Sequence, residues 1–247
     1  MINNEDLPCA LKILELRTKV FDLNLKQIEQ GYYSKAKELR ALDHELYMLY
    51  KSITKYDFIS KIKEGSTLLV GEGNLSFTIS LVKKLQLLPN LIASTYEDYS
   101  ELSEYAAFNA QLLKQAGIKV MYGLDATELH NNFYSNTFDT VIFQFPHSGS
   151  REGINGVNAN YVLVKKFITS ASYILTRDGV VLITILDSDF YNNMFRFDEL
   201  AEELRISPPT QYKFNPKDYP EYEHTMTHQD ESGIDDYSKF VTYEFRI

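Results

Sequence analysis

The sequence predicts an α/β fold: a Rossmann-like, mostly parallel sheet that ends in a C-terminal antiparallel hairpin and carries an N-terminal helical extension. Three observations predict it. After residue 65, short apolar runs alternate with amphipathic stretches, which is typical of alternating strands and helices. The first of these runs leads directly into a GxG turn. Before residue 65, apolar residues recur at helical spacing, and glycine and proline are almost absent.

The N-terminal part, residues 1–64, is predicted to be a pair of helices. Leucines at helical spacing lie on both sides of Gly31, where we expect the first helix to end. The pair either caps the following domain or serves as a dimerisation arm or substrate-recognition module, so a homodimer through these helices is one expectation. Residues 65–247 are expected to form the Rossmann-like domain, since the chain is long and hydrophobic enough for one main core.

The elements of this domain follow in order. We expect strands at residues 67–70, 91–95, 119–122, 140–145 and 180–185, with helices at 75–86, 101–116, 158–175 and 197–204. Pro208 and Pro209 are expected to stop the last helix, and strands at 211–214 and 240–245 to form the hairpin. Five alternating strands and a late hairpin are the element order of class I methyltransferases, whereas a two-halved dinucleotide-binding domain would add a sixth parallel strand.

Composition excludes several classes of protein. The formal net charge of -9 argues against a broad basic surface for holding nucleic acid, although a local basic patch stays open. The single cysteine, Cys9, has no Cys or His cluster near it, so we expect neither a disulfide nor a zinc site. Because no apolar run has membrane-spanning length and the N-terminus does not resemble a secretory leader, we expect a cytoplasmic protein without membrane contact.

The strongest local signal is the segment LLVGEGNLSF at residues 68–77, a strand that runs through a GxG turn into a helix. Glycine allows a sharp turn and close approach of a ligand, and the helix start offers free N–H groups there. We therefore expect a nucleotide-type site, with a purely structural turn as the alternative. Ser76 replaces the third glycine of GxGxxG. The cofactor-binding residues expected in the turn are Gly71, Glu72, Gly73, Asn74 and Leu75.

Two acidic residues follow the next two strands. Glu97 is the expected acceptor for ribose hydroxyls, with Asp98 as the neighbouring alternative. Asp125, followed by Ala126, is expected to contact the adenine of a bound nucleoside. The alternative for Asp125 is to cap a short helix over residues 126–129.

The fourth strand ends in the sequence FQFPHSG. In a methyltransferase with this element order, the methyl group of the donor would point toward this segment. Methyl transfer needs alignment of the reacting atoms and removal of a proton when the acceptor carries one. His147 is the candidate base, and Gln144 with the rigid Pro146 completes the predicted catalytic set; a structural histidine is the alternative. His224 and His228 have a spacing that could bind metal on a helix, but their surroundings favour a loop, and we expect no metal.

The segments LLVGEGNLSF, IASTYED, YGLDATEL, FDTVIFQFPHSG and DYPEYEH, in this order, resemble the Rossmann-like domain of eukaryotic 25S ribosomal RNA uridine-N3 methyltransferases. The resemblance covers about residues 66–247. It implies S-adenosylmethionine as cofactor, held by the matching Gly71, Glu72, Gly73, Asn74, Glu97 and Asp125. It also implies RNA as partner, a role in rRNA processing, and a uridine whose N3 carries a weakly acidic proton.

The chain departs from this family where the acceptor would bind. Gln144 stands in place of an asparagine, Leu186 in place of a lysine, and Thr225 and Met226 in place of arginines. These positions would hold an anionic RNA or a developing oxyanion. Two alternatives therefore stay open: a methyltransferase whose acceptor is a small molecule or a protein, and a cofactor-binding module without catalysis.

Overall fold

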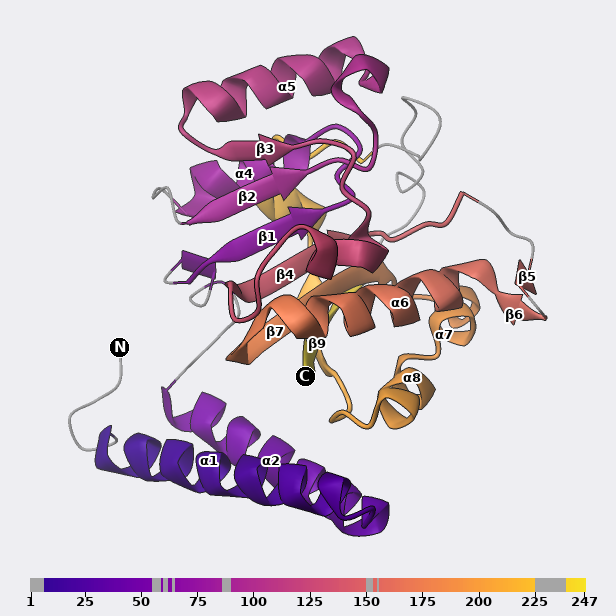
Figure 1. Ribbon diagram of the computed structural model, residues 1–247. Coiled ribbons are helices and arrows are strands. Elements are labelled where there is room, and N and C mark those ends of the chain that lie inside the picture. The colour runs from indigo at the N-terminus through magenta and orange to yellow at the C-terminus, as the bar shows by residue number, and fades with distance from the viewer. Residues whose placement is uncertain are drawn as a thin grey trace.

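The computed structural model describes residues 7–54, 59, 62–63, 65–85, 90–149, 153–154, 156–224 and 239–247. It consists of a central sheet with helices on both faces and a long helical hairpin beside it (Figure 1). The predicted fold class is thereby confirmed.

Seven strands form the sheet in the order β3-β2-β1-β4-β7-β9-β8. The parallel strands are β1 (Thr67–Val70), β2 (Leu91–Ser94), β3 (Lys119–Met121), β4 (Phe138–Gln144) and β7 (Leu175–Leu186). β9 (Phe240–Arg246) is antiparallel to both β7 and β8 (Thr210–Phe214). Every residue of β1 is buried, as expected for a parallel strand covered by helices on both faces.

The helices pack in two layers with separate apolar cores. α4 (Ser76–Leu85) and α5 (Glu104–Gln115) cover one face, while α6 (Ala159–Ile174), α7 (Asp189–Phe195) and α8 (Phe197–Leu204) cover the other. Short 3-10 turns lie at η1 (Tyr99–Glu101), η2 (Ala126–Asn131) and η3 (Pro216–Asp218). The sequence patterns missed α7 and a small separate hairpin of β5 (Gly153–Ile154) and β6 (Val157–Asn158), because both are too short to show a period.

The last predicted helix has the expected bounds but ends for another reason, and one predicted helix boundary is wrong. α8 ends at Leu204, as predicted, because Arg205 has a left-handed φ of 59° and its N–H bonds to the carbonyls of Ala201 and Glu202 close the helix before Pro208 is reached. The helix predicted from residue 101 begins at Glu104 instead. Ser103 caps it, since its side chain accepts a hydrogen bond from the Ala106 N–H.

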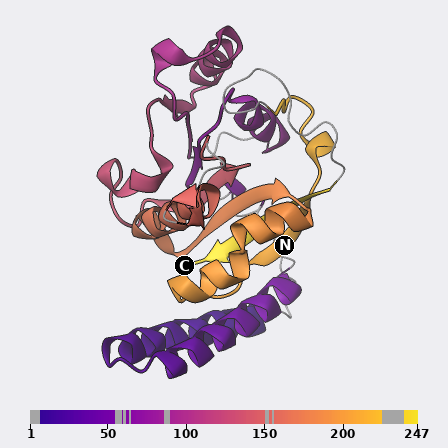
Figure 2. The ribbon, with the colours of Figure 1, turned by 90° about the vertical axis from the view of Figure 1, so that its right-hand side faces the viewer.

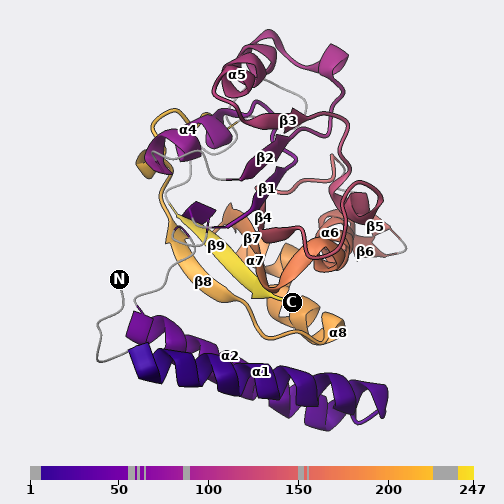
Figure 3. The same ribbon diagram turned by 60° about the vertical axis from the view of Figure 1, so that its left-hand side comes forward.

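The N-terminal helices are α1 (Leu7–Glu29) and α2 (Tyr33–Thr54), joined at Gly31, whose φ is 75°. They pack side by side against the β8–β9 end of the sheet, on the opposite side of the molecule from α5 (Figures 1 and 3). The Tyr47 hydroxyl donates to the buried carboxylate of Glu244 in β9. The hairpin therefore caps the domain. None of the described helices is long and apolar enough to cross a bilayer.

A group of ion pairs fixes the hairpin to the domain. The Arg17 guanidinium, only 7% exposed, lies 3.1 Å from Asp43 in α2 and 3.3 Å from Asp178 in β7. Arg246 in β9 lies 2.8 Å from Asp43. Burial raises the pKa of the Asp43 carboxyl, which Arg17 partly offsets. Since unpaired charge is costly away from water, these groups favour one docking position.

We expect Arg17→Met to lower the free energy of unfolding by about 2 kcal/mol, because the largely buried pair with Asp43 and the contact with Asp178 across the interface are both lost, although Arg246 still compensates Asp43. The matched control is Lys37→Met, which breaks the exposed pair of Lys37 with Glu202 at 2.9 Å. That change should cost about 0.5 kcal/mol or less. Urea unfolding of both variants measures the difference, and equal losses would contradict the role given to Arg17.

Candidate functional site

A cavity of about 730 Å³ opens at the carboxyl edge of the sheet. Residues after β1, β2, β3 and β4 line it, together with one face of α6 and the segment from Tyr222 to His224. Figure 2 views the molecule from the side toward which these ends point. The cavity lies where the chain leaves neighbouring strands β1 and β4 in opposite directions, which is where open α/β sheets bind ligands.

The GxG turn is shaped by packing as well as by the cavity. Gly71 has a φ of 63°, and a Cβ there would lie 2.6 Å from Cε2 of Phe143 in β4. Leu75, fully buried, also has a positive φ of 62°. A leucine rarely adopts this conformation, and such strain is found mostly at functional sites. The packing against Phe143 gives the turn a structural role, and ligand binding by the same turn stays a prediction that the strain at Leu75 supports.

Glu72 is the cavity carboxyl whose pKa is most perturbed. Its Oε2 accepts from the Thr78 hydroxyl at 2.7 Å, whereas Oε1 is buried without a hydrogen-bond partner in the described part of the chain. Burial raises the pKa of this carboxyl to about 7, although the Thr78 bonds lower it somewhat. A cation placed beside Oε1 would stabilise the ionised form, so the site fits the positive charge of a sulfonium donor.

Asn74 has a structural role in addition to the predicted one. Its side chain lines the cavity wall, where Nδ2 donates to the Glu223 carbonyl at 2.9 Å and Oδ1 accepts from the Ser76 N–H. Ser76 also bonds to the backbone of Glu223 in both directions. Asn74 and Ser76 thus anchor the segment after η3 over the cavity. Contact of Asn74 with a cofactor stays a prediction, since an amide can make more than these two bonds.

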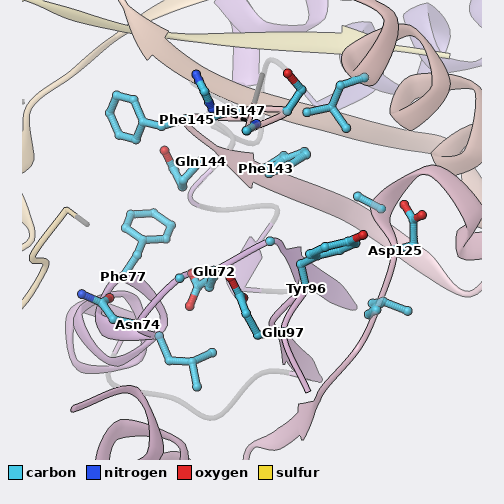
Figure 4. A pocket seen from close by; sticks show the side chains of 18 of the residues that line it. Glu72, Asn74, Phe77, Tyr96, Glu97, Asp125, Phe143, Gln144, Phe145 and His147 are labelled. Atoms are coloured by element: carbon cyan, nitrogen blue, oxygen red, sulfur yellow. Dashed lines mark hydrogen bonds between the residues drawn. The ribbon is translucent and has the colours of Figure 1, made fainter. Parts of the chain in front are cut away.

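Glu97 and its neighbour Tyr96 project from the end of β2. The Glu97 carboxylate makes no hydrogen bond within the described residues and lines the cavity, as a ribose acceptor requires. Tyr96 is 66% exposed and also lines the cavity. In Figure 4 the ring of Tyr96 lies between Glu72 and Glu97 on one side and Asp125 on the other. Tyr96 is not among the residues that the sequence predicts for the site, although an aromatic ring beside a ribose acceptor is suited to stack on a base.

Asp125 caps a short helix, which is the alternative to its predicted contact with adenine. Its Oδ1 accepts from the Thr127 N–H at 2.7 Å and from the Thr127 hydroxyl at 2.8 Å, which begins η2. The residue nevertheless lines the cavity with Ala126. Contact with adenine therefore stays a prediction, now limited to the oxygen that does not cap.

Gln144, Phe145 and His147 face Glu72 and Glu97 across the cavity (Figure 4). The Gln144 Oε1 is buried and has no hydrogen-bond partner among the described residues. Phe145 has a φ of 49°, which is strained for an aromatic residue and turns the chain out of β4. Two unpaired oxygens, Oε1 of Glu72 and Oε1 of Gln144, thus belong to residues that line the same cavity, which indicates a site for a polar ligand.

The catalytic roles of His147 and Pro146 stay predictions. The Nδ1 of His147 accepts from the Gly149 N–H at 3.0 Å, which favours the neutral ring with its proton on Nε2 and adds a donor role to the predicted role as base. Pro146 is buried and is not among the residues that line the cavity. It shapes the turn after β4.

The segment after η3 contributes residues that the sequence analysis did not assign to the site. The Tyr222 hydroxyl is 3.0 Å from Nδ1 of His224, and burial together with the Glu72 charge raises the pKa of that hydroxyl. His228, the second histidine of the spaced pair, lies outside the described residues, as do Thr225 and Met226. Leu186 is buried in the core opposite Phe240, away from the cavity. In the described part of the chain, no three His, Cys, Asp or Glu side chains are grouped to hold a metal.

The described lining of the cavity is acidic. Five carboxylates, from Glu72, Glu97, Glu101, Asp125 and Glu223, accompany one lysine, Lys166 of α6. Such a lining attracts a cationic ligand and repels phosphate. It fits a donor with a positively charged sulfur.

Comparison with known proteins gives a consistent picture. A family model named BMT5-like, with the description rRNA (uridine-N3-)-methyltransferase BTM5-like, matches residues 68–226. The human ferredoxin-fold anticodon-binding domain-containing protein 1 is 36% identical over 48% of this chain and 19% of its own length. The heavy metal-associated isoprenylated plant protein 41 of Arabidopsis thaliana is 32% identical over 63% of this chain and 32% of its own length. This chain thus spans at most about a third of either relative.

Among solved structures, the 30S ribosomal A1408 methyltransferase from an uncultured bacterium is similar with a TM-score of 0.47, at 14% identity over 76% of this chain and 90% of that one. The family match confirms the resemblance drawn from the sequence motifs and, with it, S-adenosylmethionine as the cofactor.

Glu72→Gln should change how stability depends on pH. The carboxyl has a pKa of about 7 in the fold against about 4.3 when unfolded, so the folded protein binds the extra proton and its stability falls as pH rises from about 4.5 to 7. The glutamine variant lacks this fall. Without ligand, it should exceed the wild type by about 3 kcal/mol at pH 8 and by little at pH 4.5. Urea unfolding across this range tests it; a difference independent of pH would contradict it.

Glu97→Gln should raise the dissociation constant for S-adenosylhomocysteine at least tenfold, because a hydrogen bond to a charged acceptor contributes about 1.5 to 3 kcal/mol. Glu101→Gln is the control, since that carboxylate also lines the cavity but already accepts from the Asp98 N–H at 3.0 Å. Titration calorimetry measures both. Unchanged affinity in the Glu97 variant would remove its assignment as ribose acceptor.

Proposed function

We propose, because the chain belongs to the BMT5-like family of rRNA (uridine-N3-)-methyltransferases, that it transfers a methyl group from S-adenosylmethionine to N3 of a uridine in RNA. The observation that carries the proposal is the family match over residues 68–226, which includes both walls of the cavity.

S-adenosylmethionine supplies a methyl group bound to a cationic sulfur. The residues on the β1 and β2 side of the cavity hold this donor: Glu97 accepts from the ribose hydroxyls, Tyr96 stacks on the adenine, and Glu72 compensates the positive charge. Fixing the donor in this way places its reactive carbon toward the opposite wall and leaves alignment of the acceptor as the remaining task.

The β4 wall holds the acceptor. Loss of the N3 proton from uracil to water puts negative charge on the two carbonyl oxygens that flank N3, and N3 then takes the methyl group while the sulfur keeps the electron pair of the broken bond. The amide of Gln144 and the Nε2–H of His147 are the polar groups of this wall that can donate to such oxygens. The glutamine that replaces the family's asparagine has the same amide group on a longer side chain, so donation is retained.

The acidic lining restricts how RNA could enter. A neutral base can enter the cavity, whereas its phosphates must stay outside the five carboxylates. The same lining, with Lys166 as the one described cation, favours a second candidate function, methylation of an uncharged small molecule by the same groups.

Incubation with radiolabelled S-adenosylmethionine distinguishes the two functions. We expect label in total RNA, recovered as 3-methyluridine after nuclease digestion, and none in a small-molecule extract. Label only in the extract would support the second function, and label in neither would contradict both.

Gln144→Ala and His147→Ala should each lower kcat about 100-fold, since each removes one donor to the developing anion. The dissociation constant for the donor should stay within twofold. Gln115→Ala, at the exposed end of α5 and away from the cavity, is the control and should match the wild type. Full activity in both site variants would refute the assignment of the β4 wall.

A further inference from the structure

The N-terminal hairpin has a second face, turned away from the domain, that exposes four leucines. Leu16, Leu23, Leu42 and Leu49 are 39 to 48% exposed. Each pair is seven residues apart and so lies along one line of its helix. In α1, Leu16 comes one residue before the interface residue Arg17, and Leu23 comes six residues after it. In α2, Leu42 and Leu49 have the same two spacings from Asp43. At 100° per residue, all four are turned by about 100 to 120° from the groups that dock the hairpin.

The leucines of the two helices form one stripe. Because α1 and α2 run antiparallel from the turn at Gly31, Leu23 lies nearly level with Leu42, and Leu16 with Leu49. Among the described elements, none lies against this side of the hairpin in Figures 1 and 3. Four exposed leucines in one stripe, rather than scattered singly, indicate an interaction surface.

Opposite charges border the stripe on its two sides. Lys12, Lys19 and Lys26 follow one another at intervals of seven along the outer edge of α1, and Lys19 is 62% exposed. Glu38 and Glu45 have the same spacing along the outer edge of α2. Glu15 lies between the lysines and pairs with Lys12 at 2.8 Å and with Lys19 at 2.7 Å. The α1 edge is nevertheless net positive and the α2 edge net negative.

We propose that this face binds a second copy of the chain, related by a two-fold axis parallel to the helices, so that two hairpins form a four-helix bundle. The axis places α1 of one protomer over α2 of its partner. Height along the bundle can be counted in residues from the turn at Gly31. On this count the heights of Lys26 and Glu38 differ by about two residues, or ~3 Å, and so do those of Lys19 and Glu45. Each positive edge therefore meets a negative edge in register, as an isologous interface requires.

The size of the face suits a stable dimer. Helices of 23 and 22 residues are about 35 Å long, and two of them side by side are about 20 Å wide. The face therefore covers roughly 700 Å² per protomer, close to the roughly 800 Å² typical of specific interfaces. An RNA would meet four leucines and an acidic edge beside the lysines of α1, which makes it a poorer occupant than a second copy of the chain.

Dimerisation leaves the cavity open. The leucine stripe lies on the far side of the hairpin from the domain, whereas the cavity opens at the carboxyl edge of β1 to β4. The proposal is therefore independent of the methyl-transfer reaction and can be tested without substrate.

A charge exchange monitored by sedimentation velocity tests the arrangement. We expect the wild type to be a dimer at 20 µM, and the variants Lys19→Glu/Lys26→Glu and Glu38→Lys/Glu45→Lys each to dissociate at least tenfold more readily. Mixed in equal amounts, the two variants should form a heterodimer of wild-type affinity, because the reversed edges match each other again.

Two further variants complete the design. Leu16→Gln/Leu23→Gln should be monomeric with an unchanged helical circular dichroism spectrum, whereas Lys119→Glu/Lys217→Glu, with two exposed lysines reversed elsewhere, should dimerise like the wild type. A monomeric wild type, or dimers that persist in the leucine variant, would overturn the proposal. Failure of the two charge variants to form a heterodimer would overturn the parallel two-fold arrangement.

Discussion

The contact between Gly71 and Phe143 is the constraint on which the site depends. β1 and β4 are neighbours in the sheet, yet their chains continue to opposite faces, so a hollow opens between the ends of the two strands. The Phe143 ring fills the space where a side chain at position 71 would otherwise stand. This packing holds the two walls of the cavity next to each other, with the residues proposed to hold the donor on one and those proposed to hold the acceptor on the other.

The charges that line the cavity decide which ligands it attracts. Burial keeps Glu72 ready to lose its proton near neutral pH, and four further carboxylates make the described lining attractive to a cation. The same field repels phosphate, which is consistent with the proposed cationic donor and uncharged acceptor group. An acidic chain can therefore act on RNA only if other surfaces bind the backbone and the cavity receives a base alone.

The sequence was sufficient to predict those parts of the fold and of the site that depend on local patterns along the chain. Parallel strands place their carboxyl ends at one edge, so Glu97 and Asp125 could be assigned to the site from their positions after two apolar runs. It was insufficient where a partner lies far along the chain. The bond from Asn74 to Glu223 spans 149 residues, and no local pattern places Tyr222 over the GxG turn. The proton position on His147 likewise depends on a loop hydrogen bond that only the structure shows.

The central claim is that the donor binds between the Gly71 turn and Glu97. A crystal structure of the protein with S-adenosylhomocysteine tests it most directly. The account predicts ribose hydroxyls within hydrogen-bond distance of the Glu97 carboxylate, adenine against the ring of Tyr96, and the sulfur facing Gln144. A ligand bound elsewhere, or one whose ribose lies away from Glu97, would contradict it.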